Sequence, residues 1–211
     1  MRFINIVSVA LAVLLMYGCA ARTPSDVHRL QPDETGFDQS KAVLIGIFSE
    51  GYLYRPHLPV AFFKSRQVNE ETGKITSFGL VTKEDDDPSP NVTASAFAIQ
   101  LPPGDYYMDK WAYVRYAGES MDIPDKPSFT LNAGDVAFIG EIRAIALNMC
   151  LKVYEKTDER MERIFSKYPF LKGTEVRNLM EDYDLREWPH NAYQKKVQDN
   201  KCVTVEQLLQ K

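Results

Sequence analysis

The chain has few of the residues that commonly catalyse reactions or bind metals, with three histidines and three cysteines among 211 residues. The histidines, His28, His57 and His190, are far apart, and no HExxH, GxSxG or SxxK motif is present. The acidic run Glu84–Asp87 lacks the alternation and central glycine of an EF-hand, so we expect a solvated loop there. The sequence therefore predicts a protein without catalytic residues, metal or cofactor.

Grouped positive charge is also lacking. Lysine and arginine number 25 against 29 aspartates and glutamates, which gives a formal net charge of −4 without a basic run. Because nucleic acids need grouped cations for their phosphates, we expect no nucleic-acid partner. The same charge balance argues against a second, electrostatic contact with a membrane. No apolar run reaches the roughly 20 residues that a transmembrane helix needs.

Residues 1–19 are the most informative part of the chain. Arg2 precedes an apolar run from Ile4 to Tyr17, which has the length of a signal-peptide core. Leu15 to Cys19, with the letters LMYGC, resembles the bacterial lipobox. The alternative is an ordinary secretory signal that contains an incidental cysteine.

The lipobox resemblance implies a location for the mature protein. Residues 1–18 would be removed and Cys19 would carry acyl chains, which anchor a protein stably when about two are present. Ala20 follows the cysteine in place of the aspartate that retains enterobacterial lipoproteins in the inner membrane. The resemblance therefore implies a lipid anchor in the outer membrane, with the protein facing the periplasm.

Cysteine content agrees with that location. With Cys19 acylated, Cys150 and Cys202 remain as one pair in an oxidising compartment. We predict a disulfide between them, worth roughly 4 kcal/mol in the chain-entropy model. The alternative is two unpaired thiols.

The mature chain divides into three parts. Residues 19–40 are polar and contain two prolines, which is typical of a tether with a reach on the order of 25 Å. Residues 41–154 contain short strands bounded by turn residues, which predicts a mainly β fold, an antiparallel β-sandwich. The expected strands are residues 42–48, 59–65, 75–81, 94–101, 104–116, 128–131, 134–142 and 145–154.

Two turns within the sandwich have the same form. In Leu101 to Met108 (LPPGDYYM) and Phe129 to Ile142 (FTLNAGDVAFIGEI), a strand ends, glycine supplies a positive φ, and aspartate follows. These segments resemble the sandwich domains of bacterial lipoproteins of unknown function, related to carboxypeptidase-regulatory-like and transthyretin-like modules. The resemblance covers about half of the chain, and it implies a fold without implying catalytic residues.

Residues 155–211 change to a helical period. Met161 to Tyr168 and Val176 to Tyr183 each carry apolar residues at i, i+3, i+4 and i+7, and Thr204 opens a last short helix. We expect a small α-helical C-terminal appendage packed on the sandwich. A disulfide from Cys150 to Cys202 would fasten the appendage to the sheet.

The strand from Gly104 to Tyr116 is the candidate binding element. Strict alternation places one set of side chains in the core, with Lys110 as an exception: Tyr106, Met108, Lys110, Ala112, Val114 and Tyr116. The opposite face then carries the candidate binding residues Tyr107, Trp111, Tyr113 and Arg115. Such rings stack on sugars or anchor a protein partner. The alternative is that the C-terminal helices cover this face.

Taken together, these features predict a non-catalytic binding or accessory module at the outer membrane. Its partner would be an envelope protein or cell-wall glycan. The alternative is an envelope hydrolase, or an inhibitor of one, with a site on its loops.

Overall fold

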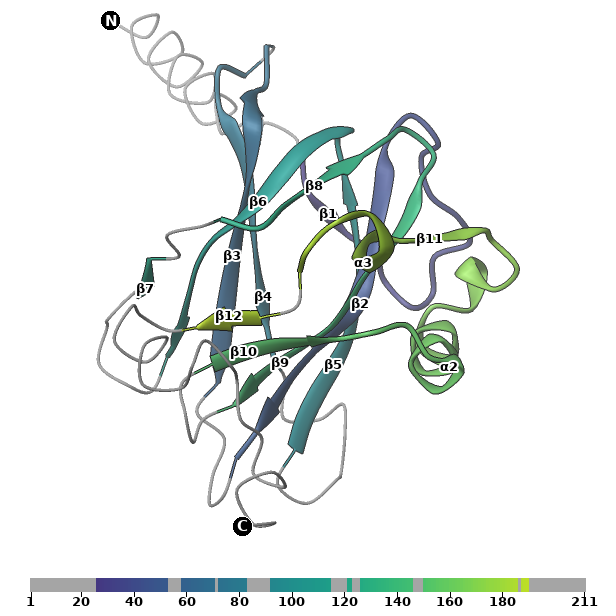
Figure 1. Cartoon of the computed structure of the whole chain (residues 1–211). Coiled ribbons are helices and arrows are strands. Elements are labelled where there is room, and N and C mark those ends of the chain that lie inside the picture. Colours follow the sequence, from purple (N-terminus) through teal and green to yellow (C-terminus); the bar gives the residue numbers. More distant parts are fainter. Residues whose placement is uncertain are drawn as a thin grey trace, which may run out of the picture.

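The computed structural model describes residues 26–52, 58–70, 72–82, 92–114, 121–122, 126–145, 150–185 and 187–189. Within them, two β-sheets pack face to face, which confirms the predicted mainly β sandwich (Figure 1). None of the helices in these ranges has the length and apolar character needed to cross a membrane. The signal segment with Cys19, as well as Cys202, lies outside the described residues.

The larger sheet, sheet A, has seven strands. It consists of β1 (His28–Arg29), β2 (Ala42–Gly51), β5 (Val92–Leu101), β9 (Val136–Ile145), β10 (Cys150–Tyr154), β11 (Val176–Asn178) and β12 (Glu187–Pro189). The strand order is β1-β5-β2-β9-β10-β12, and β11 also pairs with β9. Most neighbours are antiparallel, whereas β9 runs parallel to both β2 and β11.

The smaller sheet, sheet B, has five strands. It consists of β3 (Pro59–Val68), β4 (Ile75–Val81), β6 (Gly104–Tyr113), β7 (Met121–Asp122) and β8 (Ser128–Leu131). The order is β4-β3-β6-β7, and β8 pairs with the first part of β6. Aromatic rings from this sheet fill the space between the layers, including Phe63 and Phe78 stacked 5.0 Å apart.

The two repeated turns form as predicted. Gly104 and Gly134 have φ angles of +147° and +79°, which residues with a Cβ adopt at a cost. Asp135 accepts a hydrogen bond from the Asn132 N–H at 2.9 Å and so closes its turn locally. Asp105 instead accepts from the Thr130 hydroxyl at 2.5 Å, which links β6 to β8.

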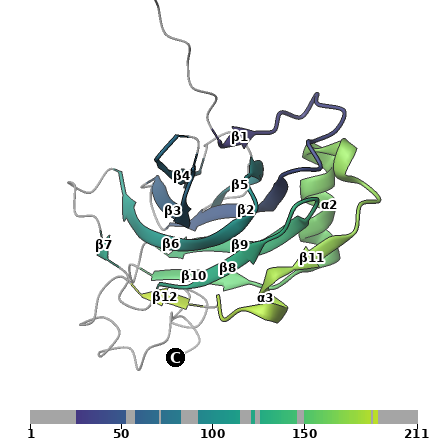
Figure 2. The ribbon, with the colours of Figure 1, turned by 90° about the horizontal axis from the view of Figure 1, so that it is seen from above.

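The outer face of sheet A is covered by α2 (Asp158–Lys167) and the 3-10 helix η1 (Pro169–Leu171). Figure 2 shows α2 beyond β2 and β5, on the side away from β3 and β4. Met161 and Ile164 are buried there against Val43 and Ile45. The predicted packing of the first C-terminal helix on the sheet is therefore present.

Thr157 caps α2, and replacing it by alanine is expected to lower the free energy of unfolding by about 1 kcal/mol. Its hydroxyl oxygen accepts a hydrogen bond from the Arg160 N–H at 3.3 Å, which satisfies one donor of the first helical turn. Urea unfolding followed by circular dichroism measures the loss. Thr157→Ser keeps the acceptor and should stay close to the wild type, so equal losses in both variants would contradict the capping role.

The prediction of a second C-terminal helix is wrong for the first half of that segment. Val176–Asn178 form β11 beside the start of β9, and only Leu179–Asp182 are helical, as α3. β10 ends at Tyr154, opposite Glu141, so the edge of β9 before that point is open for main-chain pairing. Backbone hydrogen bonds to β9 therefore stabilise a strand at Val176–Asn178 more than the helical spacing of the apolar residues stabilises a helix. The predicted appendage thus contributes strands as well as a helix to the sandwich.

The predicted single strand over residues 145–154 is two elements. Ile145 ends β9, and Cys150 begins β10 opposite it in an antiparallel pair. Leu151 and Val153 face the core, as predicted. The Cys150 side chain is outside the described set, so the disulfide to Cys202 stays a prediction.

Candidate functional site

A β-bulge in β6 reverses the side-chain alternation that the sequence suggests. Phe63 pairs with Met108, while the preceding Phe62 pairs with Lys110, so Asp109 is an extra residue on β6. One extra residue moves every later side chain of the strand to the opposite face. Lys110 accordingly lies on the outer face, where a lysine is solvated.

The bulge decides where the predicted binding residues lie. Trp111 and Tyr113 are 0% and 2% exposed, and their rings pack edge to face in the core at 5.5 Å. The predicted outward direction of these two side chains is therefore wrong. Tyr107, which precedes the bulge, is on the outer face and half-buried. Arg115 lies outside the described residues.

Cations surround Tyr107 on the outer face of sheet B. The Arg66 guanidinium lies 5.2 Å from the centre of the Tyr107 ring, and the Lys126 Nζ lies 5.3 Å from it. Lys110 Nζ lies 5.4 Å from the centre of the Phe62 ring on the same face. We call the following set the cationic face: Phe62, Lys64, Arg66, Tyr107, Lys110 and Lys126.

Asp109 holds two of these lysines in place. Its two carboxylate oxygens accept hydrogen bonds from Lys64 Nζ and Lys126 Nζ, each at 2.8 Å. Burial alone would raise the pKa of Asp109, but the hydrogen bonds and charges of Lys126 and Lys64 outweigh it and lower that pKa. The Asp109 side chain is 12% exposed, against 42% for Lys64 and 34% for Lys126. The two lysines are therefore more accessible to a ligand or a surface than the carboxylate is.

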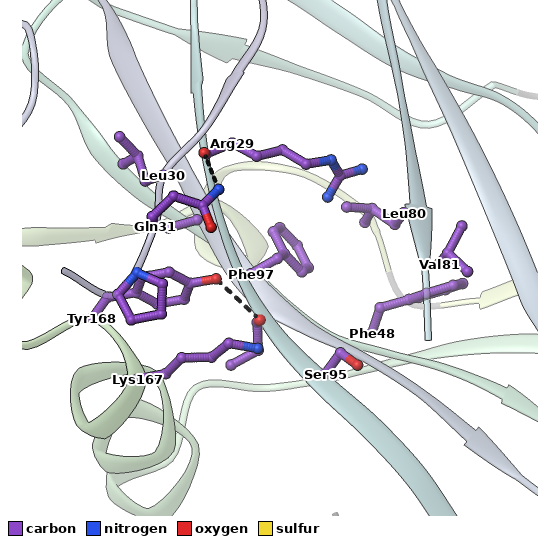
Figure 3. Close-up of a pocket in the computed structure, with 13 residues that line it drawn as sticks. Arg29, Leu30, Gln31, Phe48, Leu80, Val81, Ser95, Phe97, Lys167 and Tyr168 are labelled. Carbon is purple, nitrogen blue, oxygen red and sulfur yellow. Dashed lines mark hydrogen bonds between the residues drawn. The ribbon is translucent and has the colours of Figure 1, made fainter. Parts of the chain in front are cut away.

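A pocket of about 270 Å³ opens where the edges of the two sheets meet, between β4 and β5 (Figure 3). Its floor is apolar and consists of core residues, namely Phe48, Leu80 and Phe97. Figure 3 shows Arg29 and Lys167 on opposite sides of the Phe97 ring. We call this cavity the edge pocket.

Side chains and the backbone of β1 close the exposed edge of β5 beside this pocket. The carbonyl oxygens of Ala94, Ala96 and Ala98 accept hydrogen bonds from the Arg163 guanidinium, the Tyr168 hydroxyl and the Leu30 N–H, at 3.0, 3.3 and 3.0 Å. Arg29 likewise donates to the Gly79 carbonyl of β4 and so bridges the two sheets. These occupied carbonyls protect the edge from pairing with another strand.

A buried carboxylate connects α2 to sheet A. Glu141, 5% exposed, accepts hydrogen bonds from Ser49 Oγ at 2.8 Å, Arg143 Nε at 2.9 Å and Arg160 Nε at 2.7 Å. Burial tends to raise the pKa of Glu141, but Arg143 and the hydrogen bonds from Arg160 and Ser49 lower it overall. Every oxygen of this carboxylate is thus engaged in holding the helix on the sheet.

The chemistry-bearing residues do not converge elsewhere in the described part of the chain. Among the described residues, no group of three or more histidine, cysteine, aspartate or glutamate side chains is arranged to hold a metal. His28 lies on the surface with its Nε2 3.0 Å from Glu34. His57 and His190 fall outside the described ranges.

Comparisons with protein-family models, curated proteins and solved structures found no match to this chain. The fold and the three clusters described above are therefore the basis for any functional assignment.

Proposed function

We propose that this chain is a lipoprotein anchored in the outer membrane through an acylated Cys19, and that its sandwich is a non-catalytic binding module facing the periplasm. The observation that carries the binding role is the edge pocket, in which an apolar floor lies between Arg29 and Lys167. Concave sites with apolar walls and a few polar groups are the usual form of ligand sites.

The pocket favours a group that is apolar at one end and anionic at the other. An apolar part covering Phe97 and Leu80 gains roughly 25 cal/mol for each Å² removed from water. The anionic part would be attracted by Arg29 and Lys167. A small amphipathic anion and the carboxyl terminus of an envelope protein share this chemistry.

The position of Arg29 in the sequence places the pocket close to the proposed anchor. Arg29 is ten positions after Cys19, which is at most about 35 Å of extended chain. A ligand of the pocket would therefore come from the membrane surface or its immediate surroundings, where partner proteins of a lipoprotein are concentrated.

The binding role is tested by placing a photo-crosslinking amino acid at Gln31, an exposed residue that lines the pocket and lies outside sheet B. Crosslinking in intact cells detects a partner protein, and native mass spectrometry of detergent-extracted protein detects a small amphipathic ligand. Lys167→Glu is expected to reduce either signal about tenfold, because loss of about 1.4 kcal/mol of attraction corresponds to that factor.

The matched control is Lys172→Glu, the same charge reversal at an exposed residue outside the pocket. An equal reduction in both variants, or no crosslink and no ligand in the wild type, would contradict the binding role of the pocket. Labelling with radioactive palmitate tests the anchor separately. Label should enter the wild type and be absent from Cys19→Ala.

A further inference from the structure

We propose that the cationic face of sheet B docks on anionic phospholipid headgroups of the membrane leaflet that holds the anchor. The inference rests on the proposed lipid anchor and adds an orientation to it: the sandwich would lie with sheet B against the membrane and the α2-covered face of sheet A toward the periplasm. Three independent features of the described residues support this arrangement.

The first feature is local charge. Among the described side chains, the cationic face carries four cations against two carboxylates on the same side of β6, Asp105 and Asp109, a formal charge of +2 on a chain of −4. Asp122 of β7, whose side chain is not described, pairs in register with Lys110. Asp105 is engaged by Thr130, and Asp109 lies beneath Lys64 and Lys126. An approaching anionic surface therefore meets ammonium and guanidinium groups first, which is the pattern that attracts a protein to anionic lipid.

The second feature is exposed aliphatic surface beside these cations. Val68, Ile75 and Val81, on the adjoining strands β3 and β4, are 56%, 50% and 46% exposed. Ile75 and Val81 alternate with buried residues that face the core, so both point to the outer side of sheet B. Val68 pairs directly with Ile75. Peripheral membrane binding combines such apolar side chains with cations and with interfacial tyrosines such as Tyr107.

The third feature is the place where the chain enters the sandwich: residues 19–40 are predicted as a tether, but His28–Arg29 pair with β5 as β1 and Leu30 is buried, so the described part of this segment belongs to the fold. The Asp26 carboxylate accepts a hydrogen bond from Asn69 Nδ2 at 2.9 Å and one from Thr76 Oγ1 at 3.4 Å. The chain therefore enters the fold at the end of sheet B formed by the β3–β4 hairpin, on the core-facing side, because Thr76 alternates with the outward-pointing Ile75. Asp26 is seven positions after Cys19, which is at most about 25 Å of extended chain. The anchor thus holds this end of sheet B near the leaflet.

The low net charge of the sequence does not oppose this contact. Charges separated by more than about 8–10 Å are largely screened at physiological ionic strength, so a surface responds to the patch that faces it. The cations of the cationic face belong to β3, β6 and the segment before β8, and only folding brings them together. A modest surface affinity is sufficient for a tethered domain, because the anchor supplies a high effective concentration.

The test uses the chain without residues 1–19, which removes no described residue, and vesicle flotation without any lipid anchor. Vesicles contain phosphatidylcholine alone or with about 30% phosphatidylglycerol, as the anionic probe. We expect at least about tenfold stronger binding to the anionic vesicles at about 50 mM salt, and most of it lost at about 500 mM, where the screening length is short.

The decisive variant is Arg66→Glu with Lys110→Glu, which should abolish the preference for anionic vesicles. Lys156→Glu with Lys172→Glu makes the same charge change at exposed residues outside the cationic face and should bind like the wild type. Circular dichroism checks that each is folded; the milder pair Arg66→Gln and Lys110→Gln replaces the first if it is not, with a smaller loss expected.

Binding that is equal for both vesicle types, or lost equally in the control pair, would overturn the proposal. Tighter binding to heparin, an anionic polysaccharide probe, than to anionic vesicles would assign the face to a glycan and overturn it as well. An unlabelled Cys19 in the palmitate experiment with vesicle binding intact would overturn the anchor and leave the surface assignment standing.

Discussion

Trp111→Ala is expected to lower the free energy of unfolding by about 4 kcal/mol, the typical cost of deleting a buried aromatic ring. The indole is fully buried between the sheets and packs edge to face on Tyr113. Its truncation removes many dispersion contacts and leaves a cavity that strands tied into two sheets cannot easily fill. The residue that strict alternation would assign to a binding surface is therefore a principal core residue.

The comparison that tests this is Tyr107→Ala on the same strand. Tyr107 is half-buried on the outer face, and losing its contacts with Arg66 and Lys126 should cost about 1 kcal/mol. Urea unfolding of the chain without residues 1–19, followed by far-ultraviolet circular dichroism, gives both values. If Tyr107→Ala were the more damaging substitution, the bulge at Asp109 would be assigned to the wrong place.

The strands were predictable because the turns that bound them carry glycine, proline and aspartate. The bulge was not, since alternation continues through it in the sequence and only pairing with β3 reveals the extra residue. Lys110 was the one visible signal, because a lysine fitted the predicted core face badly. A charged residue on an otherwise apolar face of a predicted strand can therefore indicate a β-bulge, after which the side chains alternate in the opposite sense.

Residues 176–178 show the opposite limitation. Their apolar spacing with Leu179 and Met180 is helical, and these last two side chains are indeed buried. The local spacing contains no information about the open edge of β9, which is more than 30 residues away in the sequence and pairs with these residues. Tertiary hydrogen bonding therefore overrides local period where a sheet edge is vacant.

The functional clusters were beyond prediction for a related reason. The edge pocket combines β1, β4, β5 and α2, and the cationic face combines residues from Phe62 to Lys126. No local motif marks either of them, because each member is an ordinary surface or core residue in its own strand. Motif searches detect chemistry that neighbouring residues supply, whereas both of these sites are created by strand order.

Glu141→Gln is expected to lower the free energy of unfolding at neutral pH by on the order of 3 kcal/mol, as removal of one member of a buried charge cluster does. Glutamine keeps the volume and one acceptor but leaves Arg143 and Arg160 without their counter-charge. The main consequence should be a looser attachment of α2 to sheet A, which hydrogen exchange of the α2 amides would detect as faster exchange than in the wild type.

The same variant makes a prediction about acid. Because the folded-state pKa of Glu141 is lowered, its contribution is fully present above the unfolded glutamate pKa of about 4.3 and is lost as pH falls through the lower folded value. The stability difference between the wild type and Glu141→Gln should thus be constant from pH 7 to about 5 and shrink below about 4.5. Glu162→Gln, at an exposed position in the middle of α2, is the control and should follow the wild type throughout. A difference that stays constant into strong acid would mean that Glu141 acts through its shape and hydrogen bonds rather than through its charge.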